Sequence, residues 1–333
     1  MKEALIDNTI RVKIHDVPIP TPSPGQLLIR TIVPQASPSN YGDDIAGYVE
    51  AVGEGVLGFS KGDRVAAFHE MGAPHGSYAE YSIAWADSAF HIPAHITFEE
   101  AATIPLTAMT AALGLYQRLG LPLPWSAITE PLPLIIYGGA TAVGSFAIKL
   151  AALSNIHPIT AVAGNGTSYV NTLLDKSKGD TAIDYRQGEA HTLEQIKEAA
   201  GENPIIYALD TVSESNTLRM IDRALAPGKG KIANLLPSSP KNELSSELTF
   251  TMVGTIHASK STNSWPALGD REFGTLFCSF FRRGLQEGWF HGHPYEVRTG
   301  GLDALGQVLR DLEAGKNSAK KYLVKIAETK GVM

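Results

Sequence analysis

The 333-residue sequence predicts an α/β protein with a β-rich part and a doubly wound parallel sheet that carries helices on both faces. Three observations lead to this fold class. Short apolar runs separated by glycine and proline turns fill roughly the first hundred residues, which is typical of antiparallel strands. From residue 134 onward, strand-like and helix-like segments alternate, which favours a parallel sheet. The first of those strands runs into a glycine-rich turn and then a helix, the pattern of a phosphate-binding loop.

In the β-rich part, turn-forming residues separate the expected strands. The strands cover 27–33, 46–52 and 61–68, the last of which begins as a turn. The pattern becomes helical at Phe98, where Thr97 is the expected N-cap, and a second helix is expected over 108–119.

After the proline-rich stretch 121–133, strands and helices alternate. The expected strands are 134–137, 159–163, 181–185, 205–209, 231–235 and 252–257, and the helices between them include 169–176, 193–200 and 217–225. The C-terminal part returns to a long helix from Phe273, a helix near 302–314 and a last strand at 321–326.

The glycine-rich turn follows the buried strand 134–137. Gly138 and Gly139 end the strand, and Gly144 lies where an amphipathic helix begins. A helix start without bulky side chains presents backbone N–H groups and the positive end of the helix dipole, so a pyrophosphate is the expected ligand. The spacing is a variant of the dinucleotide pattern, and a tight turn without a ligand is the alternative.

In an open α/β sheet, a ligand binds over the carboxyl ends of the strands. This rule predicts one crevice for the cofactor. Its expected residues are Gly139, Ala140, Thr141, Ala142, Val143, Gly144, Gly164, Asn165, Ser168, Tyr185, Asp210, Leu235 and Leu236.

The end of the second strand of this sheet indicates which cofactor is bound. No acidic residue lies between Gly144 and Asp175, although a site for NAD usually places a carboxylate there. Instead, the polar loop 165–168 follows the strand, and Lys178 or Arg186 could add positive charge for a 2′-phosphate. The sequence therefore favours NADPH, with a merely solvated loop as the alternative.

Composition excludes several classes of function. The net charge of −6 without a basic run argues against nucleic acid as the main partner, and no apolar run is long enough to span a membrane. The single cysteine, Cys278, excludes an internal disulfide framework and a cysteine-rich zinc site. The N-terminus lacks the apolar stretch of a signal peptide, so we expect a soluble, cytoplasmic protein.

Several short motifs follow one another along the chain in a characteristic order and spacing. They are Gly-Asp-Asp-Ile-Ala-Gly (42–47), Val-Gly-Glu-Gly-Val (52–56), Gly-Asp-Arg-Val (62–65), Ala-Ala-Thr-Ile-Pro-Leu-Thr-Ala-Met-Thr-Ala (101–111), the glycine turn (139–144), Gly-Gly-Leu (300–302) and Ala-Gly-Lys (314–316). By this set, the chain resembles the medium-chain dehydrogenase/reductase superfamily, in its zinc-lacking quinone oxidoreductase and enoyl reductase branch. It looks most like the stand-alone fungal members.

The resemblance implies a fold and further cofactor contacts. It implies a GroES-like catalytic domain made of 1–108 and 270–333, with a Rossmann domain at 109–269 between them. It also implies that Thr110 lies beside the nicotinamide, that Tyr185 lies near the adenosine phosphate, and that Asn317 reaches the cofactor.

The chain departs from the family in one region. The family's Asn-Pro-x-Asp-x-Lys segment appears here as Ser-Pro-Ser-Asn-Tyr-Gly, at 37–42. That segment runs almost directly into Asp43 and Asp44, without the intervening stretch that covers part of the substrate cleft in relatives. We therefore expect a more open cleft, or one rebuilt by neighbouring loops.

No metal site or covalent nucleophile is expected. Cys278 stands alone in an apolar helix, and His69-Glu70 follows the Gly-Asp-Arg-Val strand instead of preceding it as a zinc motif does. His291 and His293 have no evident third ligand and are expected on a surface loop. No tyrosine is followed four residues later by lysine, and no Gly-x-Ser-x-Gly elbow occurs, which excludes short-chain dehydrogenase and serine hydrolase chemistry.

The remaining chemistry is hydride transfer from NADPH to a small electrophile, either a quinone or an α,β-unsaturated carbonyl compound. The charge that develops on the substrate oxygen then needs a hydrogen-bond or proton donor. Tyr41 is the candidate donor, with Asn40 as the second choice, and a purely packing role for Tyr41 is the alternative.

Three other functions stay open. One is the reduction of small aldehydes, and another is an NADPH-binding sensor or partner protein with little catalysis. The third is an enoyl reductase that acts in trans on a polyketide synthase, which requires a docking surface for a carrier protein, and no basic patch is visible for one. A homodimer through an exposed edge strand at 252–257 is also possible.

Overall fold

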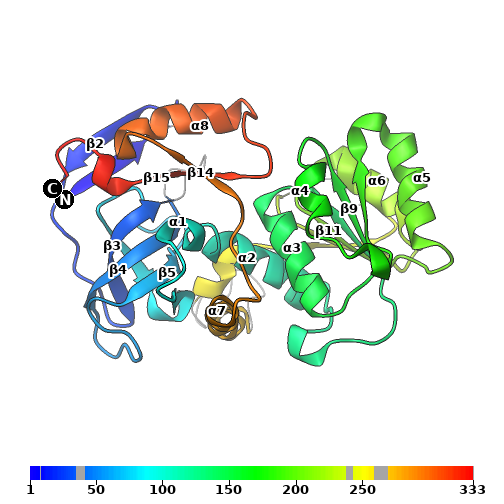
Figure 1. Cartoon of the computed structure of the whole chain (residues 1–333), viewed down its shortest axis with the longest axis horizontal. Helices are drawn as coiled ribbons and strands as arrows, with labels where there is room; N and C mark the ends of the chain where they lie inside the picture. The colour runs from blue at the N-terminus through cyan, green and yellow to red at the C-terminus, as the bar shows by residue number, and fades with distance from the viewer. Residues whose placement is uncertain (8, 35–41, 238–242, 259–268, 333) are drawn as a thin grey trace. The chain divides into compact units, whose positions relative to one another are not determined.

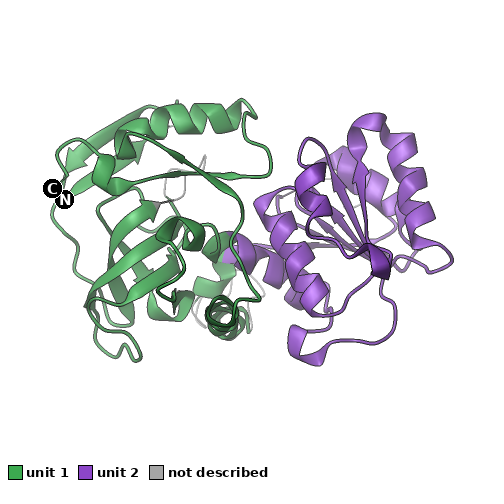
Figure 2. Cartoon of the chain, in the orientation of Figure 1, with its two compact units in different colours: residues 1–106, 254–333 green, residues 107–253 purple. Residues whose placement is uncertain are grey.

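The computed structural model describes residues 1–7, 9–34, 42–237, 243–258 and 269–332. The chain divides into two compact units, shown in Figure 2. The first unit joins residues 1–106 to residues 254–333, and the second unit is the continuous stretch 107–253. The chain thus changes unit after Leu106 and after Val253, whereas the sequence prediction placed these changes after residues 108 and 269.

The first unit is built on a five-stranded antiparallel sheet. Its strands are β3 (Gln26–Pro34), β4 (Asp44–Val52), β5 (Arg64–Phe68), β6 (Tyr81–Trp85) and β7 (Ala89–His91), in the order β6-β3-β4-β5-β7. Alternate apolar residues of these strands, such as Leu27, Ile45 and Val65, pack into one buried cluster. The first three strands confirm the expected β-rich part to within a few residues.

Two smaller sheets and several helices complete this unit. The small sheets pair β1 (Lys2–Ile6) with β2 (Val12–Asp16) and β14 (Tyr295–Arg298) with β15 (Lys321–Val324). The helices are α1 (Phe98–Ala101), α7 (Asp270–Glu287) and α8 (Leu305–Glu313), with 3₁₀ turns η1 (Ala86–Ser88), η7 (Val253–His257), η8 (Gly301–Ala304) and η9 (Ile326–Glu328). As expected, the Thr97 side chain caps α1 by accepting a hydrogen bond from the Glu100 N–H.

The second unit contains a six-stranded parallel sheet. Its strands are β8 (Leu134–Tyr137), β9 (Ile159–Ala163), β10 (Thr181–Asp184), β11 (Tyr207–Asp210), β12 (Lys231–Asn234) and β13 (Glu247–Phe250), in the order β10-β9-β8-β11-β12-β13. The strand order reverses between β8 and β11, and this switch point is where such sheets bind ligands. The fold class predicted from the sequence is confirmed.

Helices cover both faces of this sheet, as Figure 1 shows. They are α3 (Ala142–Leu153) and α4 (Thr167–Asn171) on one side, and α5 (Glu189–Ala200) and α6 (Ser215–Ala224) on the other. The chain enters the unit through α2 (Pro105–Ala112), which continues as a π-helical segment η2 (Leu113–Arg118). The remaining short 3₁₀ turns are η3 (Pro124–Ser126), η4 (Lys176–Lys178) and η5 (Tyr185–Gln187).

Two expected elements differ from the prediction. Residues 252–257 do not form the edge strand: β13 ends at Phe250, and Val253–His257 is the 3₁₀ turn η7. Val253, Thr255, Ile256 and His257 are all buried, so the burial of this segment does not by itself distinguish a strand from a 3₁₀ turn. The homodimer expected through a strand at 252–257 therefore loses the strand on which it depended.

The helix expected at 169–176 is also shorter than predicted. It ends as α4 at Asn171, and a separate turn, η4, begins at Lys176. The Asp175 side chain accepts a hydrogen bond from the Ser177 N–H (3.0 Å) and so favours a new turn over a continued helix. Among the helices that the structure describes, none has the length and apolarity needed to cross a membrane.

Candidate functional site

The glycine turn after β8 is held by contacts that admit no side chain. Gly138 has a left-handed backbone (φ +79°), and a Cβ there would lie 2.3 Å from the Thr211 Oγ1. A Cβ on Gly144 would lie 2.2 Å from the Gly138 carbonyl oxygen. Glycine is therefore required at both positions, which brings the start of α3 directly against the end of the strand.

The first turn of α3 leaves backbone donors available. Thr141 is the N-cap, and its Oγ1 accepts a hydrogen bond from the Gly144 N–H (2.9 Å). The N–H groups of Ala142 and Val143 precede the first intrahelical bonds, and no described residue accepts from them. These donors and the dipole of a 12-residue helix make this end of α3 suited to a phosphate group.

Other predicted residues line the same edge of the sheet. Gly164 follows β9, and a Cβ there would lie 2.8 Å from the ring of Tyr185, which follows β10. The Tyr185 ring is half-exposed and lies 6.3 Å, centre to centre, from that of Tyr137 at the end of β8. A small pocket of about 160 Å³ opens between the two tyrosines and Thr217. An aromatic surface thus stands beside the glycine turn.

A positive charge lies at the end of the second and third strands. The Arg186 guanidinium donates to the Asp184 carboxylate (Nη2 to Oδ2, 2.6 Å) and to the side-chain oxygen of Asn165. This ion pair lowers the pKa of Asp184 to about 2, chiefly through the side-chain hydrogen bond from Arg186. Asn165, Ser168 and Arg186 are all exposed, so they could contact a ligand over the carboxyl ends of β9 and β10.

The alternative cation, Lys178, was wrongly expected near this loop. It lies at the opposite, amino end of β10, where its Nζ donates to the Asn155 Oδ1 (2.8 Å). The reason is topological: Lys178 precedes β10 and Arg186 follows it, and a strand separates its two ends by its full length.

Asp210, Leu235 and Leu236 also lie along the carboxyl edge, and the buried Asp210 carboxylate organises the loop after β11. Its Oδ1 accepts hydrogen bonds from the N–H groups of Val212 and Ser213 (both 2.9 Å), and its Oδ2 accepts one from Thr217 Oγ1 (2.6 Å). Burial raises the pKa of Asp210 against the effect of these bonds. The Ser213 hydroxyl in turn accepts from the Leu235 N–H (2.8 Å), so Asp210 positions the edge of the site rather than facing it.

The remaining predicted residues are distributed over both units. Thr110 lies buried in α2 of the second unit, and Asn317 is half-buried in the turn before β15 of the first unit. The candidate donors Asn40 and Tyr41 lie outside the described residues.

Sequence reasoning missed a group of buried polar side chains in the first unit. They are Asp43 before β4 and Ser77 before β6, whose side chains have no hydrogen-bond partner among the described residues, and His257 in η7, whose ring packs against that of Phe68. The sequence offered one signal, which is two consecutive aspartates at the start of an apolar strand.

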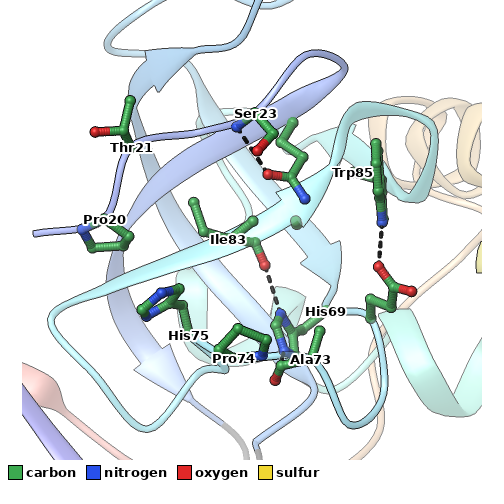
Figure 3. Close-up of a pocket in the computed structure, with 12 residues that line it drawn as sticks. Pro20, Thr21, Ser23, His69, Ala73, Pro74, His75, Ile83 and Trp85 are labelled. Atoms are coloured by element: carbon green, nitrogen blue, oxygen red, sulfur yellow. Dashed lines mark hydrogen bonds between the residues drawn. The ribbon is translucent and has the colours of Figure 1, made fainter.

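A pocket of about 330 Å³ lies in the first unit, and Figure 3 shows its lining. Its wall includes His69, whose ring nitrogens lie 2.7 Å from the Ile83 carbonyl oxygen and 3.0 Å from that of Ala73. Glu70 and Trp85 also line the pocket, and the Glu70 carboxylate accepts a hydrogen bond from the Trp85 indole (2.7 Å). Both ring nitrogens of His69 are thus engaged in bracing the loop after β5.

The other candidate metal ligands are dispersed. Cys278 is buried in α7, where burial raises the pKa of its thiol. His291 is exposed. His293 was also expected on the surface, but it is buried, and its backbone N–H donates a hydrogen bond to the Thr103 hydroxyl (2.9 Å). Within the described ranges, no three His, Cys, Asp or Glu side chains converge to hold a metal ion.

The sequence is similar to known reductases. Residues 10–94 match the family described as the alcohol dehydrogenase GroES-like domain. Over 318 residues, the chain is 39% identical to the trans-enoyl reductase fsr4 of Gibberella fujikuroi, which covers 90% of this chain and 91% of that protein. Over 339 residues, it is 35% identical to the trans-enoyl reductase resD of Aspergillus sclerotiorum, covering 90% of this chain and 93% of that protein.

Solved structures share the fold at lower identity. The CurK enoyl reductase superposes with a TM-score of 0.76 at 17% identity, covering 97% of this chain and 98% of that one. A quinone oxidoreductase from Pseudomonas syringae gives a TM-score of 0.75 at 18% identity, covering 97% and 99%. At this identity, the likeness concerns the fold alone.

Proposed function

Because the chain belongs to the enoyl and quinone reductase branch of the medium-chain dehydrogenase/reductase superfamily, we propose that it is an NADPH-dependent reductase of α,β-unsaturated carbonyl compounds. The membership itself implies an oxidoreductase with a nicotinamide cofactor. The choice of NADPH, the substrate and the residues that bind them are our proposal.

The glycine turn carries the proposal. Protein atoms leave no room for a side chain at Gly138 or Gly144, so the start of α3 lies close against the end of β8. The N–H groups of Ala142 and Val143 are available there, and such donors at a helix start suit a pyrophosphate. The adjoining residues Ala140 and Thr141 would line its near side. Thr110, Asn317 and Leu236 are assigned to the cofactor by resemblance and by their place on their elements.

The 2′-phosphate of NADPH would bind at Asn165, Ser168 and Arg186. Arg186 is held in place by Asp184, and charge-assisted hydrogen bonds to a phosphate contribute roughly 1.5–3 kcal/mol each. The Tyr185 ring beside Gly164 would lie against the adenosine part of the cofactor.

The relatives favour an enoyl group over a quinone as the natural acceptor. The two curated relatives described above carry the name trans-enoyl reductase, and the chain spans at least nine-tenths of each. We therefore propose enoyl thioesters as the substrate class, and quinones as acceptors that an open cleft also admits.

The chemistry requires little from the protein beyond orientation and a proton. When bound, NADPH supplies a hydride for the β-carbon of the substrate. The residues of the second unit hold the phosphates, and a donor from the protein must stabilise the charge that develops on the substrate carbonyl. Because Cys278 is buried and the His69 ring is occupied, we propose that this donor is not a metal ion.

The test follows NADPH oxidation by absorbance with the crotonyl thioester of N-acetylcysteamine, 9,10-phenanthrenequinone and a small aldehyde as acceptors. We expect turnover of the thioester and the quinone, NADPH preferred over NADH, and no loss of activity after treatment with a chelator. Turnover of the aldehyde alone would indicate the alternative carbonyl reductase.

NADPH binding without turnover of any acceptor would contradict the proposal and indicate a sensor or partner protein. Equal rates with NADH and NADPH would still agree with a reductase but would contradict the proposed 2′-phosphate site at Arg186.

A further inference from the structure

Three polar side chains that lie apart in the sequence meet at the amino end of the parallel sheet in the second unit. His157 lies just before β9, and Lys178 and Asp180 lie just before β10. Because β9 and β10 are parallel neighbours, their amino ends lie side by side. All three residues belong to one unit, and the full length of the strands separates them from the edge assigned to the cofactor.

The His157 ring is fixed by a buried carboxylate. Its Nδ1 lies 2.8 Å from the Asp180 Oδ1, and the side chains of His157 and Asp180 are 8% and 1% exposed. Because a carboxylate only accepts hydrogen bonds, Nδ1 carries the proton in this pair, and Nε2 of the neutral ring keeps a lone pair. Asp180 is held in turn by the N–H groups of Ile159 (2.7 Å) and Asp175 (3.0 Å). The fold therefore sets both the orientation and the tautomer of the ring.

The amine of Lys178 lies on the free side of this ring. Its Nζ is 3.5 Å from the His157 Nε2, and it donates a hydrogen bond to the Asn155 Oδ1 (2.8 Å). Lys178, His157 and Asp180 thus form a series of amine, base and orienting carboxylate. A nucleophile within reach of a base that a third group orients is the signature of an activated nucleophile, and such contacts are often longer before a substrate binds.

A pocket of about 510 Å³ opens beside the amine. Its wall includes His157, Lys178, the loop 129–131 and the end of α5. Lys178 is exposed, so a reagent can reach its Nζ from solvent. The wall also contains Glu130 and Glu198, whose charges would repel a phosphate or a carboxylate. The pocket therefore favours an uncharged reagent.

We propose that Lys178 is an acyl acceptor, whose Nζ attacks the carbonyl carbon of an uncharged thioester and retains the acyl group as an amide. The amine reacts in its neutral form, after its extra proton has gone to water. As the C–N bond forms, a second proton passes from Nζ to the His157 Nε2, and the Asp180 carboxylate stabilises the resulting imidazolium. The C–S bond then breaks, and the leaving thiolate takes that proton. His157 is the base and then the acid, and Asp180 is a positioning residue.

The acyl donor belongs to the class of compounds proposed above as substrates of the reductase, and only this choice of donor rests on the proposed function. The acceptor lies at the opposite end of the strands and needs no cofactor. Acylation would remove the charge of Lys178 and, with it, the charge-assisted hydrogen bond to Asn155.

The test incubates the wild type, without cofactor, with the butyryl thioester of N-acetylcysteamine, which has no C=C bond to reduce. Peptide mass spectrometry then measures the rate of butyrylation at each lysine. Lys176 is the internal control, because it is exposed and lies in the same turn, η4. We expect Lys178 to react at least about tenfold faster than Lys176, since a positioned base typically contributes roughly 100-fold or more. Equal rates at the two lysines would overturn the inference.

A substitution of the base tests the mechanism. His157→Asn keeps an N–H that can donate to Asp180 but removes Nε2, so Lys178 should react there at the rate of Lys176. An unchanged rate at Lys178 would mean that exposure alone selects this lysine, and would overturn the role of His157.

The wild type unfolded in guanidinium chloride gives the same comparison without a substitution. Lys178 and Lys176 should react at equal rates in the unfolded chain, because the base is no longer held beside the amine. A preference for Lys178 that persists after unfolding would overturn the inference, since the fold would then not cause it.

Lys178→Arg separates this inference from the proposed function. The variant keeps a positive charge and a donor for Asn155, should show no acylation at position 178, and should oxidise NADPH with the crotonyl thioester as fast as the wild type. If the wild type reduces no acceptor but is acylated at Lys178, the proposed function fails and the inference stands. Reduction without preferred acylation of Lys178 would overturn the inference alone.

Discussion

In the proposed NADPH site, the Arg186 guanidinium is the charged group that would bind the 2′-phosphate. Arg186 is exposed, is paired with Asp184 and reaches Asn165. Arg186→Ala should weaken NADPH binding by about 10- to 100-fold, because one charge-assisted hydrogen bond to phosphate contributes roughly 1.5–3 kcal/mol. NADH, which lacks the 2′-phosphate, should bind as before. Fluorescence titration of both cofactors measures the effect.

The matched control is Arg219→Ala, which removes an equally exposed arginine that pairs with Glu243 in the same unit. It should change neither affinity. A parallel loss of NADH and NADPH binding in Arg186→Ala would mean that the arginine supports the loop rather than reading the phosphate.

Asp43 should leave a signature in the pH dependence of stability. Its folded-state pKa of about 7 lies above the ~3.9 of an unfolded chain. Between these values the folded protein holds one more proton, so the free energy of unfolding falls as pH rises through the window, by at most ~1.4 kcal/mol per unit from this group. Asp43→Asn should flatten this slope. Urea unfolding of both proteins across the window, and one unit above it, measures the difference; equal slopes would contradict it.

At the scale of single residues, the sequence predicted positions that follow from their place on a strand. Asn165 and Arg186 lie at the carboxyl ends of β9 and β10, as a polar stretch after a strand must. Lys178 precedes the predicted strand 181–185, so the sequence itself already placed it at the opposite end from Arg186. The unpartnered Asp43 carboxyl was missed because its lack of partners depends on which side chains pack around it.

Among the elements, the turn from β8 into α3 is the most constrained. Gly144→Ala would place a Cβ 2.2 Å from the Gly138 carbonyl, and relieving that overlap should destabilise the protein by about 1–3 kcal/mol. The shift should also move the N–H groups of Ala142 and Val143 and abolish tight cofactor binding. Thermal unfolding and NADPH titration measure the two effects.

The same substitution at Gly306 is the control. This glycine lies inside α8, a Cβ there would meet nothing closer than 3.5 Å, and alanine favours a helix. Gly306→Ala should keep or slightly raise stability with cofactor binding unchanged. A Gly144→Ala protein that binds NADPH normally would contradict the assignment of the turn.

Removing the N-cap of α3 should lower the stability of the protein by a smaller amount than Gly144→Ala does. Thr141→Ala removes the acceptor of the Gly144 N–H, and loss of an N-cap typically costs about 1 kcal/mol. Thr141→Ser retains the hydroxyl and should recover most of that stability. Urea unfolding of the two variants distinguishes the cap from a general effect of mutation: equal losses would argue against the cap.

Elements with continuous apolar runs were predicted to the residue, as β8 and β9 show. The stretch 252–257 is less apolar, because glycine, threonine and histidine interrupt it, and it forms a 3₁₀ turn instead of the predicted strand. The segment η2 was likewise predicted as part of an ordinary helix and is π-helical; within it, a Cβ on Gly114 would lie 2.8 Å from the Leu209 side chain, a close approach that periodicity does not encode.

At the scale of the whole molecule, a buried ion pair joins the two chain segments that make up the first unit. Asp44 and Lys321 are 277 positions apart, and burial raises the pKa of the first and lowers that of the second. Asp44→Asn keeps an acceptor for the Leu106 N–H but removes the carboxylate charge of the buried pair with Lys321, which should cost about 3–5 kcal/mol. The double variant Asp44→Asn/Lys321→Met should recover part of that loss.

Glu50→Gln, which breaks the exposed pair with Lys61, is the control and should cost no more than about 1 kcal/mol. Urea unfolding measures all variants, and the loss should fall on the transition of the first unit, since the two units need not unfold together. If the double variant loses as much free energy of unfolding as the two single substitutions lose together, the two side chains do not stabilise each other.

The discontinuity of the first unit has a consequence for the order in which a ribosome makes this protein. Residues 107–253 emerge as one uninterrupted stretch and contain every strand of their sheet, so this unit can fold while translation continues. The first 106 residues emerge earlier but must wait, because Lys321, the cation that pairs with Asp44, is added only after the whole second unit. The part of the chain that is synthesised first is therefore completed last, and a ribosome that stops after residue 253 releases a finished nucleotide-binding fold attached to an unfinished one.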